Sequence, residues 1–303
     1  MPTSSTKATL YGLIAILLWS TVVGMIRSVS EHFGPIGGAA LIYTVGSIGL
    51  LLVLGRPRLS QFPKAYLWLG SLLFVAYELC LSLSLGFADN RHQAIEVSML
   101  NYLWPCFTLV LALILNRQKI RWWLYPGILL SLFGIGWILS GEGSWSPQNM
   151  LANVISNPLS YGLAFSGAVI WAIYCNLTQR LAKGHNGITF FFMLTALALW
   201  IQYGSSHEPA LHVNWSGAIA VGFAGAAMAC ANGLWNVGML RGNLTLLATA
   251  SYFTPVLSTF FAATLLSQSL SWTFWQGVLM VTLGSLLCWL ATRSPAPTPP
   301  IKP

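Results

Sequence analysis

The chain is a succession of apolar stretches, each about as long as the 20 residues that a helix needs to cross a bilayer. We expect ten spans, at residues 8–29, 36–54, 66–88, 93–115, 123–141, 159–181, 187–204, 216–240, 243–266 and 272–291. Only 7% of the 303 residues are charged, whereas about 25% are charged in soluble domains. Because backbone groups in lipid must be satisfied within the protein, the stretches predict an all-α, polytopic integral membrane protein.

The two halves of the sequence resemble each other at an offset of 150 residues. Asn101-Tyr102-Leu103-Trp104-Pro105 aligns with Ser251-Tyr252-Phe253-Thr254-Pro255, and Trp122, Gly127 and Gly134 align with Trp272, Gly277 and Gly284. Such self-similarity at a fixed offset indicates a duplicated structural unit. We therefore predict a five-helix repeat in residues 1–145, a second in residues 146–293, and a disordered, proline-rich tail in residues 294–303.

Basic residues in the loops predict the orientation of the chain in the membrane. Twelve of the fourteen Lys and Arg residues fall on one side of the expected spans, and only Arg27 and Arg91 fall on the other. Both termini should therefore be cytoplasmic. Because each repeat has an odd number of spans, the two halves must cross in opposite directions, as inverted repeats of transporters do. We expect the first span to be retained and not cleaved as a signal peptide, because the second half contains its full-length counterpart.

Two prolines interrupt spans at matching positions. Proline lacks a backbone N–H and clashes with the carbonyl four residues earlier, so Pro105 and Pro255 should kink the fourth and ninth spans. Irregular backbone at membrane depth is tolerated only where it is buried or lines a cavity, and interrupted helices at corresponding positions point to a transporter's binding site. We therefore expect a central cavity at the kinks, with the two prolines as hinges.

Aromatic and weakly polar side chains gather near the kinks. Tryptophans at span ends are usually interfacial anchors, but Trp19, Trp104, Trp171 and Trp235 lie too deep for that role. Helix packing explains each of them taken alone, whereas the four together favour a cavity lined by rings, which stack on flat apolar groups and attract an ammonium. The candidate substrate-binding residues are Trp19, Tyr77, Glu78, Asn101, Tyr102, Trp104, Trp171, Trp235, Asn236, Ser251 and Tyr252.

Charged residues within spans are costly and indicate functional sites by default. Glu78 lies near the middle of the third span, where it either fixes the packing as a buried, hydrogen-bonded carboxyl or faces the cavity. Glu96 and Arg27 lie near span ends, where snorkelling to the interface or pairing with a neighbour such as Glu31 is the simpler interpretation. Since Glu78 and Glu96 are the candidates for proton coupling, facilitated diffusion and antiport both stay open.

The sequence lacks the residue sets of other function classes. Asp89 is the only aspartate, the histidines lie in or beside loops, and neither an HExxH nor a GxSxG motif occurs, so we expect no enzyme. The five cysteines lie in apolar spans without a CxxC pair, which indicates neither a metal site nor a disulfide framework, and we expect no cofactor. The basic residues are spread over short loops, which does not fit a nucleic-acid-binding face.

Six motifs resemble the drug/metabolite transporter superfamily, with two halves of the EamA type. They are LIAILLWST (13–21), GSLLFVAYELCLSLSLG (70–86), HQAIEVSMLNYLWP (92–105), WNVGMLRGN (235–243), SYFTPVLS (251–258) and GSLLCWLATR (284–293). Within the superfamily the chain is most similar to exporters of bacterial inner membranes. The resemblance implies a ten-helix, multi-pass carrier in the lipid bilayer, functional as a monomer. It would export phenylalanine, tyrosine and tryptophan, together with other neutral amino acids and toxic organic cations.

In this interpretation the four deep tryptophans hold the apolar side chain of the substrate. The polar groups at the kinks hold its zwitterion, and Glu78 faces its ammonium. An organic-cation exporter of the same superfamily is the alternative; it would need an acidic cavity wall, for which only Glu78 qualifies. A receptor or scaffold without flux is an alternative of another class, and it would not need interrupted helices in both halves.

Overall fold

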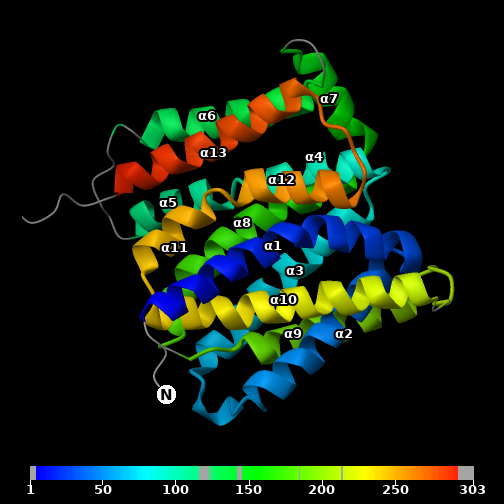
Figure 1. Ribbon diagram of the computed structural model, residues 1–303, viewed down its shortest axis with the longest axis vertical. Helices are drawn as coiled ribbons and strands as arrows, with labels where there is room; N and C mark the ends of the chain where they lie inside the picture. Colours follow the sequence, from blue (N-terminus) through cyan, green and yellow to red (C-terminus); the bar gives the residue numbers. More distant parts are fainter. Residues whose placement is uncertain are drawn as a thin grey trace, which may run out of the picture.

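The computed structural model describes residues 5–115, 122, 124–141, 145–183, 185–212 and 214–292. Within these residues all regular secondary structure is helical (Figure 1). Eight helical segments are long and apolar enough to cross a membrane. The predicted all-α, polytopic fold is confirmed. The count of ten stays a prediction, because two expected spans contain only shorter apolar helices, Leu124–Leu139 and Thr254–Leu265.

The helices follow the predicted spans. In chain order they are α1 (Ser5–Phe33), α2 (Pro35–Leu54), α3 (Ser71–Gly86, continuing the π-helical turn Tyr66–Gly70), α4 (Arg91–Asn101), α5 (Trp104–Leu115), α6 (Leu124–Leu139), α7 (Pro147–Ser156), α8 (Pro158–Leu181), α9 (Ile188–Ser205), α10 (Trp215–Arg241), α11 (Leu244–Ser251), α12 (Thr254–Leu265) and α13 (Trp272–Thr292). The short helix α7 caps one end of the bundle (Figure 1). Its first turn is fixed by Ser146, whose hydroxyl accepts a hydrogen bond from the Asn149 N–H at 3.2 Å.

The helix interruptions predicted from the prolines are confirmed at both positions. The fourth span divides into α4 and α5 at Tyr102 and Leu103, and the ninth divides into α11 and α12 at Tyr252 and Phe253. Each proline is the second residue of the helix that follows, where its missing N–H leaves no intrahelical bond unmade. In both halves the helix is therefore interrupted shortly before a proline.

Helices that correspond across the 150-residue offset make corresponding contacts. α1 packs along α10, and α3 packs along α8 (Figure 1). Since α1 corresponds to α8 and α10 corresponds to α3, each of these contacts is the counterpart of the other. Two further pairs, α2 with α9 and α6 with α13, join an element directly to its own counterpart.

Glycines allow α6 and α13 to touch backbone to backbone. A Cβ atom on Gly134 would lie 2.8 Å from the Gly277 carbonyl oxygen, and a Cβ atom on Gly277 would lie 2.8 Å from the Gly134 carbonyl oxygen. Gly127 and Gly284 meet in the same reciprocal way. Because the earlier glycine of each helix meets the later glycine of the other, α6 and α13 run antiparallel.

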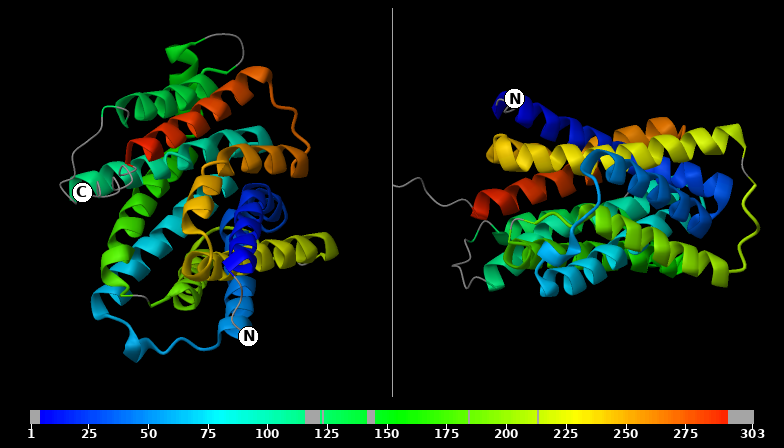
Figure 2. Two further views of the ribbon diagram at one scale, coloured as in Figure 1. Left: turned by 60° about the vertical axis from the view of Figure 1, so that its left-hand side comes forward. Right: turned by 90° about the horizontal axis from the view of Figure 1, so that it is seen from below.

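The outer surface and the chain ends fit a membrane protein. Large apolar side chains are widely exposed, among them Leu52 at 81% and Trp215 at 86%, which suits lipid as the surrounding solvent. The helices run lengthwise through the bundle, and the start of α1 and the end of α13 lie at the same end of it (Figure 2). The described chain therefore starts and finishes on one side, as the even number of predicted spans requires.

Candidate functional site

The first helix break lies against α12 of the second half in the interior of the bundle. The side chain of Tyr102, at the first break, lies beside Ser258 of α12. One turn earlier, Met99 of α4 accepts a hydrogen bond at its sulfur from the Thr259 hydroxyl at 3.4 Å. Pro105 and Pro255 are both buried. The interrupted helices of the two halves are thus in direct contact.

An aromatic stack lies next to the first break. The Trp171 ring of α8 lies 4.3 Å from the Tyr77 ring of α3, with an interplanar angle of 32°. The Tyr174 ring also stacks on Trp171, with a centroid distance of 4.9 Å and an interplanar angle of 22°. The amide of Asn101 donates to the Tyr77 hydroxyl at 3.5 Å. The structure therefore brings three predicted site residues, Trp171, Tyr77 and Asn101, to one place.

The Asn101 side chain keeps an unused acceptor at this place. The residue is 6% exposed, and within the described chain its Oδ1 atom has no hydrogen-bond partner. The Gly167 backbone of α8 approaches it closely, since a Cβ atom on Gly167 would lie 3.5 Å from that oxygen. A buried acceptor without a partner is costly, so it is suited to receive a donor from a bound molecule.

The remaining deep indoles lie elsewhere in the interior. Trp19 of α1 pairs with Trp235 of α10, with ring centroids 5.1 Å apart. Trp104, directly after the first break, packs against the main hydrophobic core and is half-buried. The four predicted indoles thus lie in three different places: Trp19 and Trp235 form a pair, Trp171 belongs to the aromatic stack, and Trp104 contacts the core. One cage built from all four stays a prediction.

Glu78 is a buried, hydrogen-bonded carboxyl, which is one of the two arrangements considered from the sequence. It is 5% exposed, and its carboxylate accepts a hydrogen bond from the Tyr43 hydroxyl of α2. The Ser82 hydroxyl lies 3.4 Å from the same Tyr43 oxygen. Sequence reasoning missed Tyr43, because a single tyrosine in a mostly apolar span is usually a packing residue.

The contacts described for the second break lie within the break itself and on α13. The Ser251 carbonyl accepts a hydrogen bond from the Thr254 hydroxyl at 2.6 Å, and the Tyr252 ring lies 6.1 Å from the Trp289 ring of α13. The Asn236 backbone belongs to α10, and its side chain lies outside the described residues. The roles of these three residues in binding stay predictions.

A cavity of about 360 Å³ opens at the end of the bundle that carries α7. Its walls come from the beginnings of α4, α8 and α13 and the ends of α6 and α7. The residues that line it are Asp89, Asn90, His92, Gln93, Glu96, Ile138, Gly141, Asn153, Ser156, Tyr161, Ser271 and Phe274. Glu96, considered from the sequence as an interfacial charge, is instead 7% exposed. Because α7 closes the cavity from outside the spans, span patterns could not reveal it.

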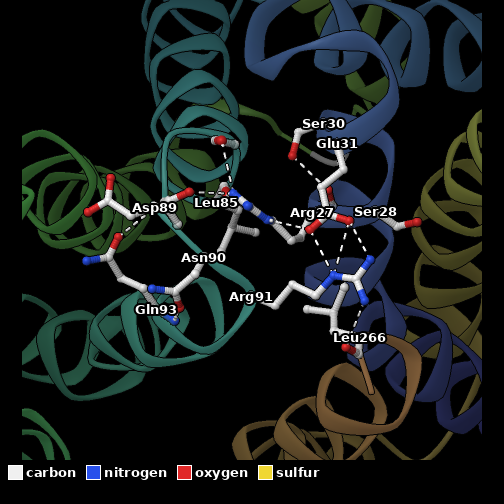
Figure 3. Close-up of polar contacts among 12 residues, drawn as sticks. Arg27, Ser28, Ser30, Glu31, Leu85, Asp89, Asn90, Arg91, Gln93 and Leu266 are labelled. Carbon is white, nitrogen blue, oxygen red and sulfur yellow. Dashed lines mark hydrogen bonds and ion pairs between the residues drawn. The ribbon is translucent and has the colours of Figure 1, made fainter. Parts of the chain in front are cut away.

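An ionic cluster joins helix ends at the side of the bundle opposite the termini (Figure 3). Glu31 of α1 accepts from the Arg27 Nε atom at 3.1 Å and from the Arg91 Nη2 atom at 2.7 Å. The predicted pairing of Arg27 with Glu31 is confirmed. Both guanidinium groups also donate to backbone carbonyls of other helices, so one carboxylate organises several chain segments.

The backbone acceptors of this cluster are helix C-termini. Arg27 donates to the carbonyls of Gly86 at 3.3 Å and Ala88 at 2.5 Å, at the end of α3. Arg91 donates to the Leu266 carbonyl at 3.1 Å, at the end of α12. A cation at a helix C-terminus satisfies unpaired carbonyls and complements the helix dipole. The cluster thereby holds α1, α3, α4 and α12 together.

Comparison with known proteins identifies similar chains. The model of the EamA-like transporter family matches residues 6–140 and again residues 158–290. Aromatic amino acid exporter YddG of Salmonella typhimurium (strain 14028s / SGSC 2262) is 52% identical over 297 residues, which is 96% of this chain and 99% of that protein. Its namesake in Escherichia coli (strain K12) is 53% identical over 95% of this chain and 98% of its own. One crystal structure aligns with a TM-score of 0.67 at 25% identity, over 95% of this chain and 98% of the other.

Proposed function

Because this chain belongs to the EamA-like transporter family, we propose that it exports aromatic and related neutral amino acids across the bacterial inner membrane. Two relatives that are 52% and 53% identical along nearly the whole chain carry the name of aromatic amino acid exporter. Eight helices able to cross a membrane provide the body of such a carrier.

The stack of Trp171 on Tyr77 is the observation that carries the assignment of the substrate site. An aromatic side chain of the substrate would take its place among these rings, where offset stacking adds about 0.5–1.5 kcal/mol to the burial of apolar area. The unpartnered Asn101 oxygen would accept a hydrogen bond from the substrate ammonium. Trp104, Tyr102 and the residues of the second break would complete the cavity in the substrate-bound state.

Transport would follow from two repeats of opposite orientation, residues 1–145 and 146–293. The antiparallel contact of α6 with α13 and the matching contacts of α1 with α10 and α3 with α8 support this division. Pro105 and Pro255 would be the hinges at which α4–α5 and α11–α12 bend to expose the site alternately to each side. The carrier would act as a monomer with both termini cytoplasmic, since twelve basic residues lie on that side.

Substrate counterflow in proteoliposomes tests the assignment of the site. Trp171→Ala should lower the initial rate of phenylalanine exchange about 10-fold or more, because it removes the stacking surface together with buried apolar area. Asn101→Leu, which keeps the size but not the amide, should lower it similarly. Trp215→Ala is the matched control, because Trp215 is 86% exposed at the start of α10.

The result also distinguishes the competing functions. If the wild type exchanges phenylalanine and Trp171→Ala does so at a rate within twofold of it, the proposed substrate site is refuted but the transport function is not. Absence of any counterflow by a folded wild-type protein would favour a receptor or scaffold. Uptake of organic cations in place of amino acids would favour the alternative substrate class.

A further inference from the structure

The 360 Å³ cavity beside α7 has a buried floor and an exposed rim. Glu96, Tyr161 and Phe274 lie on the floor, with exposed fractions of 7%, 2% and 5%. Asp89 and Asn90 on the rim are exposed. A molecule could therefore enter from the end of the bundle and reach a group that is shielded from bulk solvent. The cavity lies between α4, α6, α7, α8 and α13, apart from the Trp171 stack.

The Glu96 carboxyl group lacks a full set of partners. Tyr161 of α8 lies beside it, but in the part of the chain that the structure describes its Oε1 atom has no hydrogen-bond partner. The nearby amide of Gln93 is engaged otherwise, since its Nε2 atom donates to the Ser156 hydroxyl at 3.5 Å and its oxygen accepts from the Asp89 N–H at 2.6 Å. A buried carboxylate oxygen without a partner is unfavourable unless a cation or donor arrives.

The protein's own cations do not supply that partner. The described lining contains two carboxylates, Glu96 and Asp89, and neither a Lys nor an Arg. Arg91, although it begins α4, points to Glu31 and the Leu266 carbonyl, away from Asp89 and Gln93 (Figure 3). The two carboxylates therefore attract a cation and repel an anionic group.

The walls and volume indicate which kind of cation. The Phe274 and His92 rings meet at 5.7 Å with an angle of 72°, and Ile138 adds an apolar surface on the floor. The Phe274 ring can hold an apolar body, and its face attracts an adjacent cation. A space of about 360 Å³ is larger than a bare metal ion needs. Moreover, an amino-acid zwitterion would bring a carboxylate toward two others.

We propose that this cavity is a second binding site, for monovalent arylalkylamines that lack a carboxylate, with the ammonium at Glu96 and the ring against Phe274. The site differs in place and in ligand chemistry from the amino-acid site proposed at Trp171. It gives the chain a cation-selective pocket at the end where substrate would enter or leave. The pocket does not depend on the proposed transport activity.

Direct binding of tryptamine to the detergent-solubilised full-length protein tests the proposal by titration calorimetry. Tryptamine should bind saturably, and Glu96→Gln should raise its Kd about 10-fold or more, whereas Glu96→Asp should retain most of the affinity. Trp171→Ala, which alters only the proposed amino-acid site, should leave the tryptamine Kd within twofold. Variants are compared after their thermal unfolding midpoints have been shown to match the wild type.

Two measurements on the wild type keep the proposal open to refutation even if a variant misfolds. N-acetyltryptamine keeps the ring but has no charge, and it should bind at least 10-fold more weakly than tryptamine. Equal Kd values for the two compounds, no saturable tryptamine binding, or displacement of tryptamine by equimolar tryptophan would each overturn the proposal. Failure of phenylalanine counterflow would refute the transport function and leave this result unaffected.

Discussion

Replacing Glu31 by glutamine should loosen the ionic cluster that joins four helix ends. The change keeps the size of the side chain but removes the charge that Arg27 and Arg91 share. Arg91 contacts both carboxylate oxygens, with Nε to Oε1 at 3.0 Å and Nη2 to Oε2 at 2.7 Å. Arg27 contacts Oε1 at 3.1 Å. Neither guanidinium group can donate equally well to an amide, which has one acceptor oxygen.

The expected loss follows from how far each side chain is exposed. Arg27 and Glu31 have side-chain exposures of 11% and 24%, so their charge-assisted bond should contribute about 1–2 kcal/mol. Arg91 is 45% exposed, and solvent screening reduces its contribution to about 0.5–1 kcal/mol. The sum is about 1.5–3 kcal/mol of unfolding free energy, equivalent to about a 10- to 150-fold change in the unfolding equilibrium.

Double-mutant cycles in mixed-micelle unfolding experiments measure these contributions separately. Glu31→Gln and Arg91→Gln should couple by about 0.5–1 kcal/mol, and Glu31→Gln and Arg27→Gln by about 1–2 kcal/mol. Arg58→Gln is the control, because Arg58 is exposed in the loop after α2, and its effect should be additive with Glu31→Gln. If the unfolding free energies of the Glu31 variant and of both arginine variants were strictly additive, the contacts within the cluster would contribute nothing to stability.

Two further predictions concern stability. Gly134→Ala should lower the unfolding free energy by about 1–3 kcal/mol, because its Cβ atom would lie 2.8 Å from the Gly277 carbonyl oxygen. The control is Gly162→Ala, whose Cβ atom would meet no atom within 4 Å; it should leave the unfolding free energy nearly unchanged in the same assay. Glu208→Leu should lower the unfolding free energy by about 0.5–2 kcal/mol, because the Glu208 carboxylate accepts hydrogen bonds from the Ile36 and Gly37 N–H groups, both at 2.9 Å, and so caps α2. Glu208→Asp should recover part of this stability. Equal losses in the two variants would exclude the capping role.

Features with a local cause could be predicted from the sequence. The breaks before Pro105 and Pro255 follow from the chemistry of one residue and its preceding turn, so they appear where expected. The glycines at 127, 134, 277 and 284 were recognisable from the repeat offset, and they form the closest helix contact described above. In both cases the information lies within a few residues or repeats at a fixed spacing.

Features that depend on distant helix ends could not be predicted. Arg27 binds carbonyls about sixty positions later in the chain, and Glu78 accepts a hydrogen bond from Tyr43, which lies on a different span. The Glu96 cavity exists because α7 folds over the ends of neighbouring helices. The sequence placed aromatic residues at suitable depths, but only tertiary packing decides that Trp171 meets Tyr77 while Trp19 meets Trp235.

The reciprocal glycine contact between α6 and α13 bears on how a duplicated carrier could arise. The same surface occurs once in each half, and it is complementary to itself when one copy is turned over, as in an isologous dimer interface. A half-length chain with such a helix would already meet an oppositely inserted twin through it, before any fusion of genes. Fusion of two copies would then have preserved an existing dimer interface and made the association of two separate molecules unnecessary.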